Sequence, residues 1–462
     1  MKITPTFVSF FHPRLLVLGW LAAAGAVAAI AAETRDARMW KAGAAAIDIT
    51  PEGPIWMAGY GARKKPSEGV SQKLFAKALA LEDAWGTPMV MVTLDLISVP
   101  RRVRDEVERQ SRERYQLRPE SLLLNASHTH SGPAPYARGV GDPAYVEKAE
   151  SYGRMLEQKI VEVIGQAIAR LEPATLHYTH ARAGFAMNRR LRVGTEIRNS
   201  PNPEGPVDHD VPVLRVTGAD KKVRAILFGY ACHNTVTGFY TINADYAGYA
   251  QAFLEETRPG TVALFMMGAG GDQNPYPRHL SLEQSAQHGR TLANAVEAAL
   301  SVTTPRPVLG PLRSAFGHAE LDYADISRAD LERRAQSRAA DEKKRAGELL
   351  AQLEKGTLPK SYPCPVQVVQ FGTDVTLIAI GGETTVDYSL RLKHELGSGP
   401  AAIWVAGYSN DVFGYLGSRR VIVEGGYEGY SANLGRHPGP WATSSEDRII
   451  SLVYELSRSI NH

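Results

Sequence analysis

Short apolar runs alternate with longer amphipathic segments along most of this chain. The apolar runs are bounded by Gly, Pro or Asp, which is typical of strands. The longer segments place apolar residues three and four positions apart, as one face of a helix requires. We expect strands at residues 44–49, 78–82, 89–94, 122–126, 211–216, 224–231, 262–267, 366–371, 376–379 and 402–406, and helices at 103–116, 145–171, 246–256, 282–300, 327–354 and 446–459. This alternation predicts an α/β fold.

The composition excludes several classes of protein. Lys and Arg total 52 against 49 for Asp and Glu, which gives a net charge of +3 over 462 residues. Because so small an excess gives no electrostatic footprint for nucleic acid, we expect no nucleic-acid partner. Two cysteines are too few for a disulfide scaffold or an all-cysteine metal cluster. Cys232 and Cys364 could pair in an exported protein or remain as two buried thiols, and the sequence favours neither.

The N-terminal segment has the pattern of a secretory signal. Residues 15–32 carry no charge, Lys2 and Arg14 precede them, and Ala29-Ile30-Ala31 offers a cleavage site of small residues. We expect a signal peptide at residues 1–31 and a secreted or periplasmic mature protein. An uncleaved N-terminal membrane anchor is the alternative.

The remaining residues, 32–462, contain no linker that separates two domains, and we expect a single domain. Within it, residues 327–355 are highly charged with both signs interspersed. That pattern is typical of a solvated helix or helical hairpin, here inserted between core strands. The Pro-rich stretch 199–212 we interpret as a loop near a site rather than as a domain boundary.

Three histidines follow predicted strands. His128 and His130 lie in the segment SHTHSGP, directly after the apolar run 122–126. On an extended segment, side chains two residues apart point the same way. One metal ion could bind both, or one histidine could bind the metal while the other transfers protons; a surface pair without function is the alternative. His233 ends another apolar run in a similar context.

Further polar side chains follow other apolar runs. Asp272 and Asn274 lie in a Gly-rich loop that lacks the sequence signatures of phosphate-binding loops. Glu383 lies in the segment GGETT, and a carboxylate is a suitable zinc ligand beside imidazole. Tyr415 and Tyr427 come later in two Gly-rich segments. Because tyrosine is an uncommon metal ligand, spacing alone favours these two as aromatic walls of a pocket.

The order of these motifs resembles the catalytic domain of the neutral/alkaline non-lysosomal ceramidases. The shared features are SHTHSGP, a histidine at a strand end, a Gly-Asp loop closed by Pro, GGETT, and a tyrosine pair whose second member opens Tyr-Glu-Gly. The segments AAAIDITP and AGY near residue 50 also resemble the start of that domain. The likeness spans about residues 42–440. It implies an α/β fold built as a mixed-sheet sandwich flanked by helices, with a zinc site at strand ends.

The resemblance also implies a reaction and a set of site residues. The family uses zinc to cleave the amide of N-acylsphingosine. The implied zinc ligands are His128, His233, Glu383 and Tyr415. The implied catalytic residues are His130 for proton transfer, Tyr427 for polarising the carbonyl and Arg189 near the substrate's polar groups, with Asp272 and Asn274 as substrate-binding residues. The implied partner is a small-molecule or lipid substrate, with membrane-surface contact left open and no protein partner expected.

Two departures from the family pattern bear on the substrate. Asn274 stands where the family carries a serine, and an amide cannot act as a nucleophile. With asparagine at this position, a reaction through zinc-activated water remains possible, whereas a covalent step through serine does not. We also expect no counterpart of the family's immunoglobulin-like C-terminal domain in the short stretch after the last motif. A zinc enzyme for a carbohydrate or other polar substrate, and a non-catalytic binding protein stabilised by zinc, are the alternatives.

Overall fold

The computed structural model describes residues 40–136, 143–278, 280–302, 305–324, 326–338, 340–433 and 437–461. The expected signal peptide at 1–31 lies outside the described residues. Among the helices within these ranges, none combines the length and the apolar character needed to cross a membrane.

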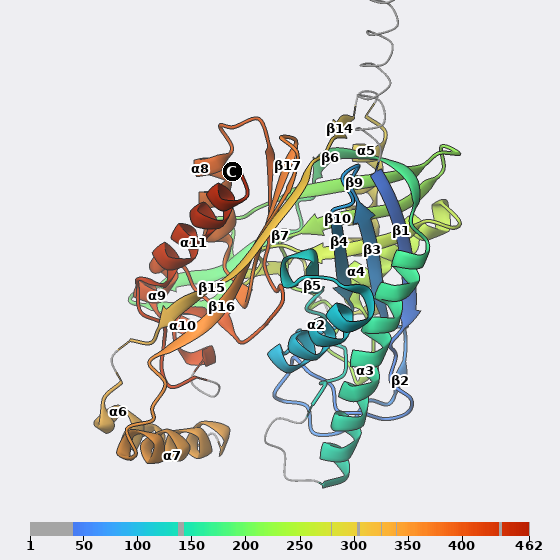
Figure 1. The fold of residues 1–462 in the computed structure, drawn as a ribbon. Helices are drawn as coiled ribbons and strands as arrows, with labels where there is room; N and C mark the ends of the chain where they lie inside the picture. Colours follow the sequence, from blue (N-terminus) through green and yellow to red (C-terminus); the bar gives the residue numbers. More distant parts are fainter. Residues whose placement is uncertain are drawn as a thin grey trace, which may run out of the picture.

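A nine-stranded mixed sheet forms the larger half of the molecule (Figure 1). Its strands lie in the order β12-β10-β9-β6-β1-β3-β4-β5, and β14 pairs with β6. The pairs β4–β5 and β10–β12 are parallel and the others antiparallel. The bounds are β1 Trp40–Asp48, β3 Phe75–Glu82, β4 Pro88–Leu94, β5 Leu122–Ala126, β6 Glu172–Arg182, β9 Asp210–Gly218, β10 Val223–Tyr230, β12 Val262–Met267 and β14 Arg306–Val308.

A second sheet has the order β15-β16-β17-β19, and three small pairings complete the strands. The second sheet comprises β15 Leu312–Asp322, β16 Ser361–Phe371, β17 Val375–Ile380 and β19 Ala402–Ala406. The small pairings join β2 (Gly69–Val70) to β11 (Thr241–Ile242), β7 (Ala186–Val193) to both β8 (Glu196–Asn202) and β13 (Gln273–Pro275), and β18 (Glu383–Thr384) to β20 (Tyr415–Leu416).

The two larger sheets pack face to face, and helices cover both outer faces. Leu227 of β10 shares a core with Trp404 of β19, whereas its neighbours Ile226 and Phe228 pack in the core that includes α4 and α5. This period of two is what a strand buried on both faces requires. Figure 1 shows α3 along β1 and β3 on one side and α8 and α11 beside β15–β17 on the other. The predicted mixed-sheet sandwich flanked by helices is therefore confirmed.

The helices have the following bounds: α2 Arg101–Tyr115, α3 Pro143–Ala169, α4 Asp245–Thr257, α5 Leu282–Leu300, α6 Arg328–Arg334, α7 Ala340–Glu354, α8 Val386–Leu396, α9 Arg419–Glu424, α10 Gly426–Gly429 and α11 Ser445–Ser459, with short 3-10 turns at Pro119–Ser121 and Ser431–Asn433. The charged stretch between β15 and β16 forms α6 and α7, which project from the sheets in Figure 1. Leu331, Ala346 and Leu349 of these two helices are buried. The stretch is thus a helical hairpin.

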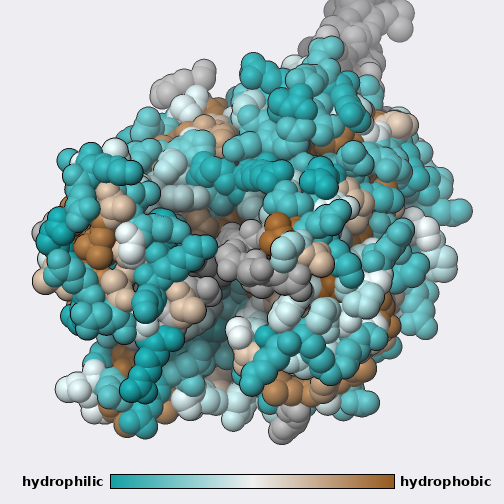
Figure 2. Space-filling view, turned by 90° about the horizontal axis from the view of Figure 1, so that it is seen from below, coloured by the Kyte–Doolittle hydropathy of each residue, from teal (hydrophilic) through white to brown (hydrophobic). Residues whose placement is uncertain are grey.

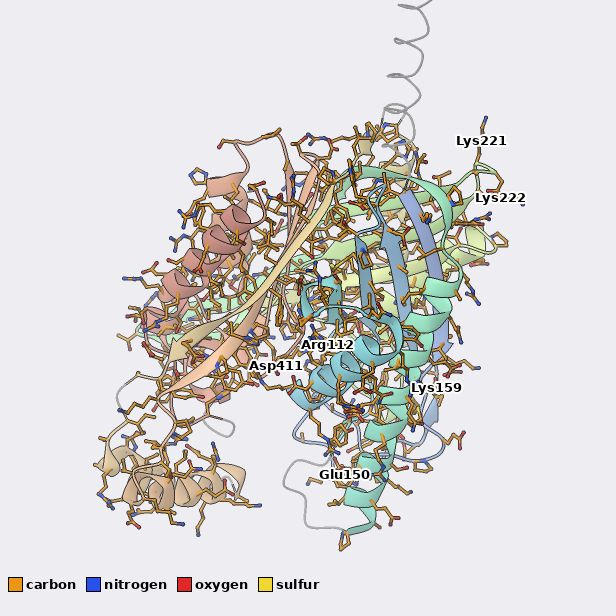
Figure 3. The ribbon with its side chains drawn as sticks, in the orientation of Figure 1. Arg112, Glu150, Lys159, Lys221, Lys222 and Asp411 are labelled. Atoms are coloured by element: carbon orange, nitrogen blue, oxygen red, sulfur yellow. The ribbon has the colours of Figure 1, made fainter. Side chains whose placement is uncertain are left out.

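Asp411 holds the segment that leads to Tyr415 at the seam between the two halves of the molecule (Figure 3). Its Oδ2 lies 2.8 Å from Nη2 of Arg101 on α2 and accepts a 2.6 Å hydrogen bond from the hydroxyl of Tyr362 on β16. The contact fixes α2, the second sheet and the segment after β19 against one another.

The two cysteines are free and buried. Cys232 packs in the core beneath α4 and α5, whereas Cys364 packs in the core between the second sheet and α11. Of the two alternatives left by the sequence, the structure has the pair of buried thiols.

Gly43 gives a test of the packing between β1 and α3. A Cβ atom at this position would lie 2.2 Å from the backbone oxygen of Ala167 and 2.7 Å from the carbonyl carbon of Arg170. Backbone cannot yield as a side chain does, so we expect Gly43→Ala to lower the free energy of unfolding by about 1–3 kcal/mol. Urea unfolding followed by circular dichroism measures the change.

The control for this prediction is Gly347→Ala on α7, where a Cβ would meet nothing within 4 Å. Removing a glycine from an exposed helical position should raise the free energy of unfolding by about 0.5–1 kcal/mol. Equal stabilities of the two variants would contradict the close packing at Gly43.

Candidate metal centre

The ends of strands from both sheets bring the predicted ligands together. His128 and His130 follow β5, His233 follows β10, and Glu383 begins β18 shortly after β17. Since β4–β5, β10–β12 and β17–β19 are parallel pairs, the loops after them gather at common sheet edges. The carboxyl ends of strands are where open α/β sheets place their sites.

Backbone pairing fixes these loops relative to one another. Thr129 forms an isolated bridge with Asn234, and the amide of His130 donates to the carbonyl of Asn234 at 3.1 Å. This tie holds the two histidine segments side by side. In the β18–β20 pair, Glu383 lies opposite Tyr415. Sequence-distant ligand candidates therefore become neighbours through main-chain contacts.

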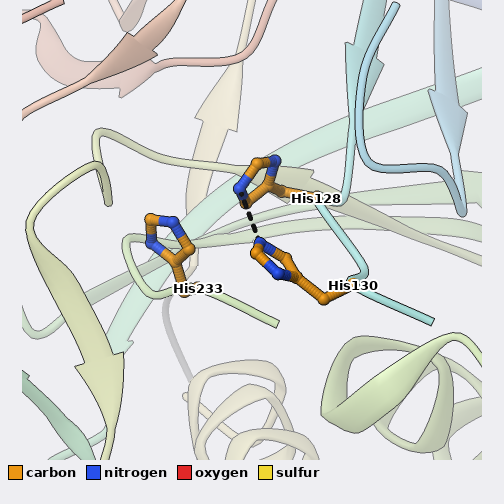
Figure 4. A group of neighbouring side chains, drawn as sticks. All are labelled: His128, His130 and His233. Carbon is orange, nitrogen blue, oxygen red and sulfur yellow. Dashed lines mark hydrogen bonds between the residues drawn. The ribbon is translucent and has the colours of Figure 1, made fainter. Parts of the chain in front are cut away.

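Three imidazole rings and one carboxylate converge in this arrangement. The Nε2 atoms of His128 and His233 lie 3.2 Å and 3.6 Å from Oε2 of Glu383. Nε2 of His130 lies 3.1 Å from Nε2 of His128, as the dashed line in Figure 4 marks. One ring nitrogen from each of the three histidines lies within 4.8 Å of the other two. The arrangement could hold one metal ion.

Hydrogen bonds to backbone carbonyls orient the rings of His128 and His233 for metal binding. Nδ1 of His128 lies 2.7 Å from the carbonyl oxygen of Ile97, and Nδ1 of His233 lies 2.8 Å from that of Gly270. A carbonyl oxygen can only accept, so each Nδ1 carries the proton and each Nε2 keeps its lone pair. Backbone carbonyls commonly fix metal-ligating histidines in this way.

Protonation states at the site also favour a cation. Burial raises the pKa of Glu383, but the proximity of His128 and His233 outweighs it and holds the pKa well below its usual value. Burial, followed by repulsion from Arg189, lowers the pKa of His233 to about 3. Burial and the two neighbouring histidines lower the pKa of His130 well below 6.5. An ionised carboxylate therefore lies beside the neutral imidazoles of His130 and His233.

The residues present fit a zinc ion. Oε2 of Glu383 is buried and has no hydrogen-bond partner within the described part of the chain, and it faces Nε2 of both His128 and His233. Acceptor atoms that face one another at such distances repel unless a cation lies between them. Two imidazoles and a carboxylate are a common set of protein ligands for catalytic zinc.

Tyr415 lies beside this group but is held by an arginine. Its hydroxyl lies 3.4 Å from Nε2 of His233 and accepts a 2.8 Å hydrogen bond from Nη2 of Arg189. Burial raises the pKa of Tyr415 well above 10, although Arg189 acts in the opposite direction. The neutral phenol is at most a weak fourth ligand, and its ligand role stays a prediction.

The guanidinium group of Arg189 lies among hydrogen-bond partners instead of pointing into open space. Nε donates to Glu428 at 2.8 Å, and Nη1 donates to Oδ1 of Asn274 at 3.2 Å. Together with Tyr415, these contacts engage all three nitrogens of the guanidinium group. The structure thus brings Arg189, Asn274 and Tyr415 into one hydrogen-bonded group.

Asp272 lies behind this group, fully buried. Its Oδ1 accepts from the amide of Val386 at 2.9 Å, and its Oδ2 accepts from Nδ2 of Asn188 at 3.0 Å. Its carbonyl oxygen also accepts from the amide of Arg189. These contacts join three loops of the site, and a role in substrate binding stays a prediction.

Tyr427 lies at the margin of the site with 46% of its surface exposed. Its ring centroid lies 5.3 Å from that of Tyr415. Both tyrosines line a cavity of about 360 Å³ that also contains His128, His130 and Glu383. The two tyrosines are therefore walls of the pocket, as their spacing alone predicts.

One member of the site carried no role in the sequence reasoning. Glu428 follows Tyr427 and binds two arginines, yet the Tyr-Glu-Gly motif served only as part of the resemblance. The one signal in the sequence for a role of Glu428 is that it directly follows Tyr427, a predicted catalytic residue. Its partners lie some 240 positions earlier in the chain, as Arg189 and Arg190, so spacing could not reveal the contact.

The histidines predict a pH-dependent stability for the metal-free protein. His233 has a folded pKa of about 3, below the unfolded value of about 6.5. Between these values the unfolded chain binds a proton that the folded protein does not. Stability should therefore fall as the pH drops below about 6.5, by up to about 1.4 kcal/mol per pH unit for each such histidine.

Urea unfolding of the chelated protein across this pH range measures the effect. His233→Gln should give a shallower dependence, because glutamine does not titrate. An unchanged slope in that variant would contradict the assignment.

Comparison with known proteins identifies the same family that the sequence motifs resemble. The family model for the N-terminal region of neutral/alkaline non-lysosomal ceramidase matches residues 40–302. The chain is 26% identical over 240 residues to neutral ceramidase of Pseudomonas aeruginosa, covering 49% of this chain and 36% of that protein. It is 25% identical over 268 residues to neutral ceramidase A of Dictyostelium discoideum, covering 53% of this chain and 37% of that protein. These matches span little more than a third of the relatives' length.

The fold extends the likeness over most of the chain. The crystal structure of neutral ceramidase from Pseudomonas aeruginosa matches with a TM-score of 0.71 and 20% identity, covering 91% of this chain and 74% of that one. A structure of ceramidase complexed with C2 matches with a TM-score of 0.72 and 19% identity, covering 92% of this chain and 75% of that one. Since the family model covers more than half of the chain, the chain belongs to the neutral/alkaline non-lysosomal ceramidase family.

Proposed function

We propose that this protein is an exported zinc-dependent hydrolase that cleaves the amide bond of an N-acyl lipid through a metal-activated water. The observation that carries the proposal is the convergence of His128, His233 and Glu383 on one point, with Nδ1 of each histidine held by a backbone carbonyl and Nε2 directed at Glu383. Membership of the ceramidase family supports the choice of an amide bond. The neutral ceramidase relatives support a lipid substrate.

His128, His233 and Glu383 would hold the zinc ion, with Tyr415 as a weak fourth ligand. Zinc held in such a site lowers the pKa of water to about 7 and polarises a carbonyl oxygen. The chain's own residues then act on the substrate. The Tyr427 hydroxyl, at the mouth of the cavity, donates a hydrogen bond to the carbonyl oxygen as negative charge develops there.

His130 carries the proton in this scheme. Its Nε2 faces His128, and its buried Nδ1 has no hydrogen-bond partner among the residues that the structure describes. The lowered pKa of His130 leaves it neutral, so it can accept the proton that the attacking water gives up and deliver it to the amine nitrogen as the C–N bond breaks. Asn274, held by Arg189, offers its amide group for substrate binding and takes no covalent role.

The cavity beside the candidate ligands favours catalysis over a structural role for the metal. Structural zinc sites are closed by four protein ligands, whereas catalytic sites keep one position for water or substrate. Here the cavity of about 360 Å³ borders His128, Glu383 and Tyr415 directly. A small molecule can therefore approach the candidate ligands.

A substrate panel tests the proposed function. Purified protein is offered N-acylated sphingoid bases, N-acyl amino sugars and aryl glycosides, and the released fatty acid, amine or sugar is measured. We expect release of fatty acid and free amine from the N-acyl lipids. Turnover of amino sugars or glycosides with none of the lipids would replace the lipid substrate by a polar one. Absence of turnover with zinc bound would favour a binding protein.

Export and domain extent form part of the same proposal. We infer that residues 1–31 are a cleaved leader and that residues 32–462 act as one catalytic domain. Mass spectrometry of protein recovered from the extracytoplasmic fraction should find a new N-terminus after Ala31.

A further inference from the structure

Glu428 joins two neighbouring arginines in the interior. Its Oε1 lies 2.8 Å from Nε of Arg189, and its Oε2 lies 2.6 Å from Nη1 of Arg190. Glu428 is 2% exposed, and both arginines are buried. Because attraction between charges strengthens where water is excluded, this contact is stronger than a surface ion pair.

The double contact joins two consecutive residues of β7. Consecutive side chains of a regular strand point to opposite faces. The pairing of β7 with β8 is irregular at this point, because its register shifts between Asn188 and Arg190 and Arg189 lies opposite two residues of β8. A bulge of this kind re-aims side chains locally, and here both Arg189 and Arg190 reach Glu428.

Glu428 also fixes a short element that has little support of its own. The α10 turn contains only Gly426–Gly429 and follows Gly425, which like Gly426 has a positive φ. A single turn of helix is not stable in isolation. Its hydrogen bonds to the side chains of β7 come from Glu428, one residue after Tyr427 of the cavity wall, whose ring also lies beneath the guanidinium group of Arg189.

The same link extends to the metal centre. Arg189, held by Glu428 through Nε, donates through Nη2 to the hydroxyl of Tyr415 at 2.8 Å. The guanidinium group is planar and its donors have fixed directions, so anchoring one nitrogen sets the direction of another. Burial and the attraction of Tyr415 and Glu428 leave the pKa of Arg189 well above its usual value, so the group stays charged.

We propose that Glu428 is a positioning residue, which acts through Arg189 to hold the Tyr415 hydroxyl at the metal centre and through α10 to hold Tyr427 at the cavity. The inference rests on the proposed metal centre but not on the identity of the substrate. It predicts that a change at Glu428 alters metal affinity although Glu428 does not touch the metal-binding atoms.

The binding of Co²⁺ tests this proposal. Co²⁺ is titrated into the chelated full chain, and the visible absorption of the bound ion reports affinity and geometry. Glu428→Gln keeps the size of the side chain but presents an amide donor to one of the arginines. We expect its dissociation constant for Co²⁺ to rise by about 10–100-fold, as loss of an outer contact to a ligand does, with a changed spectrum.

Glu424→Gln is the matched control. Within the described residues, Glu424 forms ion pairs with Arg190 at 3.1 Å, Arg192 and Arg420, but none with Arg189. This variant removes a carboxylate from the same arginine pair, and its Co²⁺ affinity and spectrum should stay those of the original protein. Equal Co²⁺ affinity in Glu428→Gln and Glu424→Gln would overturn the proposal.

A double-variant comparison separates positioning from general loss of stability. In a Tyr415→Phe background the hydroxyl is gone, so adding Glu428→Gln should change Co²⁺ affinity by less than about twofold. A full additional loss in that background would overturn the route through Tyr415. If Glu428→Gln does not fold, Arg189→Gln breaks the same link from the other side and should show the same loss.

Turnover distinguishes this inference from the proposed function. A protein that binds Co²⁺ as expected in all variants but hydrolyses no N-acyl lipid refutes the substrate and supports the role of Glu428. With an active protein, Glu428→Gln should lower kcat more than it raises KM, because the positioned groups act on the reacting carbonyl.

Discussion

Replacing Glu383 with glutamine is expected to abolish metal binding and to lower turnover of an N-acyl lipid by at least about a thousandfold. The carboxylate supplies the negative charge that faces Nε2 of both His128 and His233. Glutamine has the same shape, but it lacks the charge and brings an amide group against a neighbouring ring. Metal content by mass spectrometry and release of fatty acid measure the two effects.

Asp387→Asn is the control for this variant. Asp387 lies four positions later, on α8, and its carboxylate pairs with Arg420 at 2.9 Å, away from the histidines. That variant should keep its metal and its turnover. A Glu383→Gln protein that retains a full complement of metal would contradict the ligand assignment.

The second large effect is expected for Tyr427→Phe, which should lower kcat by about 10²–10³. The change removes only the hydroxyl that we propose donates to the substrate carbonyl. Metal content should stay unchanged, because Tyr427 is not among the predicted ligands. Steady-state kinetics of fatty-acid release, together with metal analysis of the same preparation, give both quantities.

Tyr430→Phe is the matched control, since Tyr430 lies three residues later and lines a different cavity, with Trp441 and Ile422. Its kcat should equal that of the original protein. If Tyr427 is only an aromatic wall, phenylalanine preserves that wall and both variants retain full turnover. Unreduced kcat in Tyr427→Phe would therefore contradict the role in polarising the carbonyl.

The shape of the surface bears on how a substrate approaches. Figure 2 views the face that carries the hairpin of α6 and α7 and the start of α3, and a hollow divides it. The visible surface around the hollow is mainly hydrophilic, with smaller hydrophobic patches. Contact with a membrane surface stays a prediction.

The sequence predicted those parts of the fold that depend on local pattern. Continuous apolar runs such as β12 and β17 are buried on both faces, so their composition alone identifies them. β6 was not predicted because its buried residues, among them Leu176 and Tyr178, alternate with polar ones and form no continuous apolar run. Its place between β1 and β9 depends on long-range pairing, which no short window contains.

The candidate site was likewise predictable in part: its motifs are local in the sequence, but several of its contacts are not. His128 and His130 share one segment, and motif order brought His233, Glu383 and Tyr415 into the same hypothesis. The engagement of Arg189 with Glu428, and the buried place of Asp272, depend on contacts between loops far apart in the chain. The Glu428 contact joins a four-residue helix to the place where the register of β7 and β8 shifts, and neither feature has a signature in spacing.

The most direct test of a metal-dependent hydrolase is to remove and restore the metal in one preparation. The purified protein is analysed for zinc, treated with a chelator, and then given back a single equivalent of zinc, with release of fatty acid from N-acylsphingosine measured at each stage. We predict one zinc ion per chain, loss of turnover on chelation and recovery on addition of zinc. Undiminished turnover by the metal-free protein would contradict the account.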